Sequence, residues 1–214
     1  MRNYVTEFTG TFFLSLTVGM TVLNGTPLAP LAIGSAMMVM VYMGGHVSGG
    51  HYNPAISLAA VLRGALPVRQ FLPYVGSQLL GAVAAGLMTQ LIMGNTMALA
   101  PDVDATTLAA MLNEILFTFA LCLVVLHVAT SKKTRGNSYY GLAIGFTVAV
   151  GVFAGGNVSG GAYNPAVGVG LNLVHRVLTG AGMGHMWLYI AGPLVGSALA
   201  ALVFRLQEPD EATA

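Results

Sequence analysis

The chain has 214 residues, of which 56% are hydrophobic and only 7% are charged, and its formal net charge is +1. A soluble domain carries about 25% charged residues, so this composition excludes an ordinary soluble surface and indicates an integral membrane protein. The small net charge also excludes a basic field for nucleic acid, and the single cysteine, Cys122, excludes an internal disulfide.

Six apolar runs are long enough to cross a bilayer as helices. They are expected near residues 4–23, 30–48, 70–93, 108–129, 139–157 and 185–206. Helices are expected because only helices and closed barrels satisfy the backbone in lipid, and the sequence lacks the alternating pattern of barrel strands. Close helix-to-helix contacts are predicted at small residues, among them Gly76, Gly81, Gly86, Gly192 and Gly196. The predicted fold class is therefore an all-α membrane protein.

Two further apolar stretches, residues 54–62 and 165–174, are too short to span the membrane. About ten helical residues reach roughly 15 Å, which is half of the hydrocarbon core. Each stretch begins at Asn-Pro, where Asn53 or Asn164 can cap a helix and the proline suits the first helical position. We therefore expect two re-entrant half-helices. The Gly-rich backbone before each must lie inside protein or along a water-filled cavity.

The Gly-rich segments belong to an internal duplication. GGHVSGGHYNPA at residues 44–55 recurs as GGNVSGGAYNPA at residues 155–166, with ten of the twelve letters identical. The similarity extends into the flanking spans, so each half contains three spans and one half-helix. Because three is an odd number, the second half enters the membrane from the opposite side, and the repeat is inverted.

The inverted repeat predicts the domain organisation and the topology. A single domain over residues 1–214 would contain repeats of about 1–94 and 108–207, joined by a linker of about 95–107. With the N-terminus inside, seven basic residues face the cytoplasm, namely Arg2, Arg63, Arg69, Lys132, Lys133, Arg135 and Arg205, as the positive-inside rule requires. We expect a multi-pass protein of the cell (inner) membrane, with both termini cytoplasmic and both Asn-Pro-Ala helix ends near the mid-plane.

A family resemblance rests on SGGHYNPA at residues 48–55, SGGAYNPA at residues 159–166, Glu7, Glu114 and Gln78. With these residues, the chain resembles the aquaporin family (major intrinsic proteins) over nearly its whole length. The resemblance implies six tilted helices and two half-helices around one pore per subunit, in a homotetramer embedded in the lipid bilayer. It implies a passive channel for water and small uncharged solutes that excludes ions and largely excludes protons. It implies no enzymatic activity and no cofactor.

The expected pore site is built on the two motifs, Asn53, Pro54, Ala55, Asn164, Pro165 and Ala166. The asparagine oxygens would cap the half-helices, which leaves the NH₂ groups as donors to a passing water, while the positive helix ends repel protons and cations. The resemblance adds pore-facing carbonyls from Gly49, Gly50, His51, Tyr52, Gly160, Gly161, Ala162 and Tyr163. Glu7 and Glu114 are expected to bond loop N–H groups, with a proton relay as the alternative.

The outer constriction departs from the family pattern. Most members continue the second triplet as Asn-Pro-Ala-Arg, whereas Val167 stands at that position here. Counting from the triplets, the resemblance assigns Ile33, Val152 and Gly161 to the other three positions of the outer selectivity filter. None of the four is charged, aromatic or His, so we expect a wider and more apolar filter. Two alternatives stay open, an open filter or one refilled by a neighbouring loop.

The same residues leave other functions and sites open. One alternative is a channel mainly for a neutral solute other than water, such as ammonia, urea, hydrogen peroxide or glycerol. A secondary transporter is the weaker alternative, because it needs a charged or cation-coordinating site that the loops lack. His46 and His51 are expected to brace the first loop rather than to gate the pore, and no His grouping has metal-ligand spacing. The methionines around Met37 are expected to pack or to face lipid.

Overall fold

The computed structural model describes residues 1–182 and 184–211, and these residues form eight α-helices. The helices are α1 (Arg2–Leu23), α2 (Ala29–Ser48), α3 (Pro54–Arg63), α4 (Val68–Met93), α5 (Thr107–Val125), α6 (Tyr140–Ser159), α7 (Pro165–Thr179) and α8 (Leu188–Gln207). A π-helical turn continues α5 as Leu126–Thr130, and 3-10 turns cover Lys132–Thr134 and Pro209–Glu211. Six helices are long and apolar enough to cross a membrane, which confirms the predicted class of a multi-pass all-α membrane protein.

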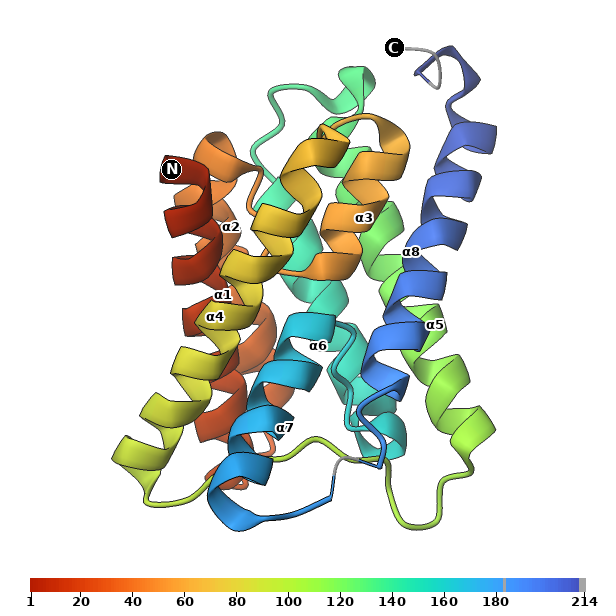
Figure 1. Ribbon diagram of the computed structural model, residues 1–214. Coiled ribbons are helices and arrows are strands. Elements are labelled where there is room, and N and C mark those ends of the chain that lie inside the picture. The colour runs from red at the N-terminus through yellow and green to blue at the C-terminus, as the bar shows by residue number, and fades with distance from the viewer. Residues whose placement is uncertain (183, 212–214) are drawn as a thin grey trace.

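The two short helices α3 and α7 occupy opposite halves of the bundle (Figure 1). Both begin near the middle, and α3 runs toward the end that carries the first residue while α7 runs toward the other end. α7 extends to Thr179, five residues beyond the predicted end at residue 174. α7 ends at Gly180, which is in a left-handed conformation (φ 75°), just as Gly64 (φ 84°) ends α3. The basic residues near 175 do not end α7, because positive charge in the last turn suits a helix C-terminus.

The two repeats interlock. α1 packs on α4 in the first half and α5 packs on α8 in the second, while α2 and α6 pack against each other across the halves. Each half-helix packs on the last span of the opposite repeat, α7 on α4 and α3 on α8. The two half-helices are therefore positioned by both halves of the chain together.

Glycines set the closest approach between helices. A Cβ atom at Gly34 would lie 2.5 Å from the carbonyl oxygen of Gly145, and a Cβ atom at Gly145 would lie 2.5 Å from that of Gly34. Of the glycines that the sequence singled out, Gly81, Gly192 and Gly196 face similarly tight contacts, and Gly86 faces a looser one, 3.0 Å from the Val174 side chain. Within this chain Gly76 makes no such contact, because it lies on an exposed face of α4 where a Cβ would meet nothing within 4 Å.

Replacing Gly145 by alanine is expected to lower the stability of the bundle by about 1–3 kcal/mol, because the new methyl group overpacks the α2–α6 contact. Gly76→Ala is the matched control, and we expect it to leave stability unchanged or to raise it by up to about 1 kcal/mol through helix propensity. Thermal unfolding in detergent, followed by near-UV circular dichroism, measures the difference. Equal midpoints for the two variants would contradict the close approach of α2 and α6.

The segment that follows α8 is tied to the bundle by a buried carboxylate that no sequence motif indicated. Glu211 accepts hydrogen bonds from Arg63 at 2.6 Å, from Ser131 Oγ at 2.8 Å and from the Lys132 N–H at 3.0 Å. Burial alone would raise the pKa of Glu211, but these hydrogen bonds and the Arg63 charge together lower it. The tether therefore contributes fully above the ordinary carboxylate pKa and is lost only as the pH falls through the lowered pKa.

Candidate functional site

The two asparagines of the repeated motif meet between the half-helices. Asn53 Oδ1 accepts from the Ala55 N–H at 2.8 Å, and Asn164 Oδ1 accepts from the Ala166 N–H at 2.9 Å, so both side chains cap their own helices as expected. Each motif proline is the first residue of its helix, and the motif prolines and alanines are buried. The inverted repeat thus brings the two positive helix ends together.

The asparagine amides also cross-link the two loops. Asn53 Nδ2 donates to the carbonyl oxygen of Tyr163 at 2.8 Å, and Asn164 Nδ2 donates to that of Tyr52 at 2.9 Å. An amide NH₂ group carries two N–H donors, so one donor on each asparagine is already used. This refines the sequence expectation, because a single N–H on each side chain is left for a passing water, and the two tyrosine carbonyls each already accept one hydrogen bond.

The two loops have the same backbone conformation. Tyr52 and Tyr163 have φ angles of 51° and 46°, in the left-handed region that a bulky residue seldom adopts. The hydroxyl of Tyr52 donates to the Met40 carbonyl and that of Tyr163 donates to the Gly151 carbonyl, both at 2.9 Å. With the N–H, carbonyl and hydroxyl groups of both tyrosines bonded, the surrounding helices hold the strained turns in place.

Glu7 braces the first loop from inside α1. Its Oε1 accepts from Ser48 Oγ at 2.6 Å and from the His51 N–H at 3.0 Å. Its Oε2 accepts from the Tyr52 N–H at 2.7 Å and from Gln78 Nε2 at 2.8 Å. The side chain is fully buried, and four donors occupy its two oxygens. These contacts are those of a loop brace rather than of a group exposed to a proton path.

Glu114 makes the equivalent contacts in the second loop, but it accepts one hydrogen bond fewer than Glu7 does. It accepts from Ser159 Oγ at 2.6 Å, from the Ala162 N–H at 3.0 Å and from the Tyr163 N–H at 2.8 Å. The missing fourth donor corresponds to Gln78, whose counterpart in the duplicated sequence is Pro193, a residue with no side-chain donor. The two braces are therefore related by the repeat but are not equivalent in energy.

A cavity of about 50 Å³ lies beside the asparagine pair. Its polar lining comes from Asn53, Asn164 and the backbone of residues 160–163, and most of the rest is aliphatic. The four residues that the sequence assigns to the outer filter all line this one cavity, namely Ile33, Val152, Gly161 and Val167. None of the described residues that line the cavity carries a charged side chain.

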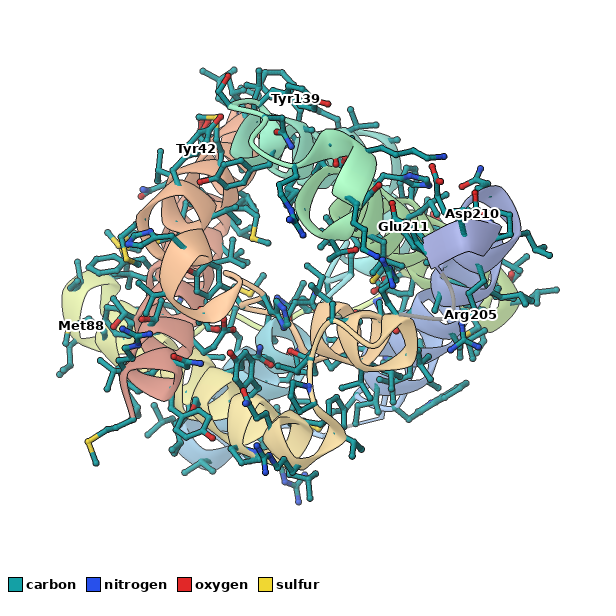
Figure 2. All side chains as sticks on the ribbon, turned by 90° about the horizontal axis from the view of Figure 1, so that it is seen from above. Tyr42, Met88, Tyr139, Arg205, Asp210 and Glu211 are labelled. Carbon is teal, nitrogen blue, oxygen red and sulfur yellow. The ribbon has the colours of Figure 1, made fainter. Side chains whose placement is uncertain are left out.

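Wider spaces lie at the two ends of the bundle. One of about 570 Å³ adjoins the cavity at the end toward which α7 runs, and the two share the lining residues Val22, Ile33, Met97, Val152 and Gly160. At the opposite end, a space of about 380 Å³ is lined by the end of α2, including His46 and Gly49, and by residues 128–137. Figure 2 looks onto this second end, where the helices surround a central opening. The cavity thus adjoins a wide space on one side, and a second wide space lies at the opposite end of the bundle.

The remaining predicted pore residues have different positions. Gly160 to Tyr163 line the cavity, while Gly49 lines the space at the other end. Gly50 and His51 are buried, and the His51 ring braces the loop as expected, with Nδ1 3.1 Å from Ser57 Oγ.

Two methionines in the cavity wall were not predicted as pore residues. Met37 is 1% exposed and belongs to the buried core, which confirms the expectation that it packs, and it also lines the cavity. Its spacing of four from Ile33 on one helix face could have revealed it. Met97 also lines the cavity, although it lies in the expected linker, where no pattern pointed to a pore role.

Comparisons with known proteins agree with this arrangement. The family model described as Major intrinsic protein matches residues 1–204. Nodulin-26 of Glycine max is 36% identical, over 96% of this chain and 78% of that protein. Glycerol uptake facilitator protein-like 6 of Lactiplantibacillus plantarum is 32% identical, over 99% of this chain and 100% of that protein. The X-ray structure of the aquaglyceroporin from Plasmodium falciparum has a TM-score of 0.82 at 21% identity, covering 100% of this chain and 99% of that one, which supports the fold alone.

Proposed function

The chain belongs to the major intrinsic protein family and is a channel for water and small uncharged solutes, and we propose that an apolar outer filter sets its selectivity. The proposed filter consists of Ile33, Val152, Gly161 and Val167. The observation that carries this proposal is that all four line the same cavity beside the asparagine pair. With valine in place of arginine, the filter lacks a fixed charge and five N–H donors.

Selection by such a filter would rest on size and on the cost of desolvation. An ion would have to shed water without any replacing ligand, which is expensive in an apolar passage. Water, ammonia, hydrogen peroxide and glycerol carry no charge, so their desolvation would cost far less free energy. The name of the bacterial relative refers to glycerol uptake, which makes glycerol the first solute to compare with water.

Proton exclusion is assigned to the asparagine pair. A water between Asn53 and Asn164 would accept from the one free N–H of each amide, so its own hydrogens would point away along the pore. That orientation interrupts a chain of donors and acceptors through the centre. The two helix N-termini add positive potential at the same place. Flux that rises linearly with solute concentration supports the channel, and saturable ion-coupled flux would support the transporter alternative.

The topology and assembly are proposed on the same basis. We assign the α3 end of the bundle to the cytoplasm, because seven of the eight Lys and Arg residues fall there in the positive-inside scheme. The domain is proposed to span residues 1–214, with inverted repeats of about 1–94 and 108–207. Four such subunits would form a homotetramer in the cell (inner) membrane, each with its own pore.

Val167→Arg is expected to lower glycerol flux much more than water flux. The guanidinium group would project into the passage between the cavity and the wide outer space, which narrows the route for the larger solute. A barrier raised by about 1.4 kcal/mol for glycerol lowers its flux about tenfold. Stopped-flow light scattering on proteoliposomes measures both fluxes, with Val167→Leu as a control for added bulk without charge. An unchanged ratio of glycerol to water flux in Val167→Arg would remove Val167 from the filter.

A further inference from the structure

Asn113 lies on α5 directly before Glu114 and contacts the second loop, residues 159–163, from behind. Its side chain is 9% exposed, and its Nδ2 lies 2.9 Å from the Gly155 carbonyl oxygen, 2.7 Å from Ser159 Oγ and 3.0 Å from the Tyr163 hydroxyl. A carbonyl oxygen only accepts hydrogen bonds, so the NH₂ group must face it, and its two N–H donors serve three acceptors. This one amide therefore holds both ends of the loop.

The hydrogen bonds of Asn113 reach the cavity through two residues. Ser159 Oγ also accepts from the Gly161 N–H at 3.1 Å, so this hydroxyl helps to fix a residue of the proposed filter. The Tyr163 hydroxyl holds the ring of a residue whose φ is 46° and whose carbonyl oxygen accepts from Asn53 Nδ2 at 2.8 Å. Asn113 itself does not belong to the cavity lining, so its effect on solutes must pass through the loop.

The first loop lacks the equivalent of this contact. In the register of the duplication, Asn113 corresponds to Thr6, whose hydroxyl donates at 3.0 Å to a carbonyl oxygen of its own helix. The first loop is instead supported by an amide from Gln78, which donates to Glu7 at 2.8 Å. Each loop is therefore supported by one buried side-chain amide, but the two amides come from different helices and bind different acceptors.

We propose that Asn113 is a positioning residue for the outer filter, acting through the second loop. The proposal rests on the channel function and filter proposed above. The amide supplies the second loop with donors that complement Glu114, which only accepts, and it fixes Gly161 and the Tyr163 carbonyl in the cavity wall. Without the amide, the Glu114 brace and the bond from the Tyr163 hydroxyl to the Gly151 carbonyl remain. The loop then keeps its fold, but the wall yields more easily to a larger solute.

The first test removes the amide and keeps the branched shape of the side chain. Asn113→Leu is expected to raise the ratio of glycerol to water flux severalfold in proteoliposomes, measured by stopped-flow light scattering. This ratio does not depend on the number of channels, so a loss of folded protein alone does not change it. Thr6→Val is the matched control at the corresponding position of the other repeat. Equal ratios in Asn113→Leu and Thr6→Val would overturn the proposal.

A second variant separates the loss of the amide from overpacking. Asn113 packs tightly on Gly155, because a Cβ atom at residue 155 would collide with Asn113 Oδ1. Asn113→Ala removes the amide without added bulk and should raise the flux ratio in the same direction. Gly145→Ala is the control for lowered stability, because its new methyl group meets α2 and not the second loop. If Gly145→Ala raised the ratio as much as Asn113→Ala, the effect would be that of any weakened bundle and the proposal would fail.

Hydrogen exchange followed by mass spectrometry measures the positioning without any solute. In Asn113→Leu, the backbone amides of residues 159–163 should exchange faster, because the Gly161 N–H donates to the same Ser159 hydroxyl that Asn113 holds. Residues 48–52 of the first loop are the internal control, and their exchange should stay unchanged. Faster exchange in both loops, or in neither, would contradict the assigned role.

The failure of this inference can be told apart from the failure of the proposed filter. If Val167→Arg changes the flux ratio and both Asn113 variants leave it unchanged, only this inference fails. If instead the Asn113 variants raise the ratio and Val167→Arg leaves it unchanged, Val167 is removed from the filter and the role of Asn113 is supported.

Discussion

Glu7→Gln is expected to remove most of the yield of folded protein. The carboxylate accepts four hydrogen bonds, two on each oxygen, and both oxygens accept from a loop backbone N–H. Whichever way the glutamine amide is turned, its NH₂ group faces the N–H of either His51 or Tyr52. A buried donor is then left unpaired beside another donor. Breaking such a buried charged contact costs about 3–5 kcal/mol, which is a large share of the stability of a single domain.

The yield of monodisperse protein after detergent extraction, together with its thermal midpoint, measures this loss. Glu114→Gln should be the milder variant, because Glu114 accepts three hydrogen bonds and has no partner equivalent to Gln78. Asp104→Asn, at an exposed position in the connection between α4 and α5, is the control for the same chemical change. If Glu7→Gln assembled normally and instead lost a proton-dependent flux, the brace would be wrong and a proton relay would be supported.

Asn53→Asp is expected to make the channel leak protons. The aspartate still offers an oxygen to cap α3, so the half-helix keeps its first hydrogen bond. The amide donor is lost, however, and a carboxylate oxygen would face the Tyr163 carbonyl oxygen, which Asn53 Nδ2 approaches at 2.8 Å. The cross-link between the loops is broken, and a negative charge replaces an N–H that orients water. We expect a rise in proton permeability of about tenfold or more, for a barrier lowered by about 1.4 kcal/mol.

Proton permeability is measured in proteoliposomes with an internal pH-sensitive dye after a pH jump. Asn164→Asp should behave alike, because the repeat gives it the matching bond to Tyr52. The control is Asn24→Asp, an exposed amide at the end of α1. If both variants retained water flux and had the same proton permeability as the control, the asparagine pair would not be what sets the proton barrier.

The sequence was sufficient for the parts of the molecule that depend on local pattern. Six long apolar runs predicted the six spans, because a bilayer imposes both a length and a helical backbone. Asn-Pro before a short apolar run predicted each half-helix start, since capping involves residues only two or three apart. The duplicated motif predicted that the two starts meet. The end of the second half-helix was misplaced, because Gly180 rather than the charged residues stops it.

Tertiary structure decided what depends on contacts between distant residues. Hydrogen bonds cross-link Asn53 to Tyr163 and Asn164 to Tyr52, and each uses one of the two N–H donors of an asparagine amide. These cross-links follow from how the loops dock and not from either motif alone. Met97 shows the same limit. The connection between α4 and α5, which carries Met97, has no periodic pattern, and its position comes from the hydrogen bond between Leu99 and Asn172, 73 residues away in the chain. Local spacing cannot encode such a contact, because it arises only when α7 and this connection are packed together.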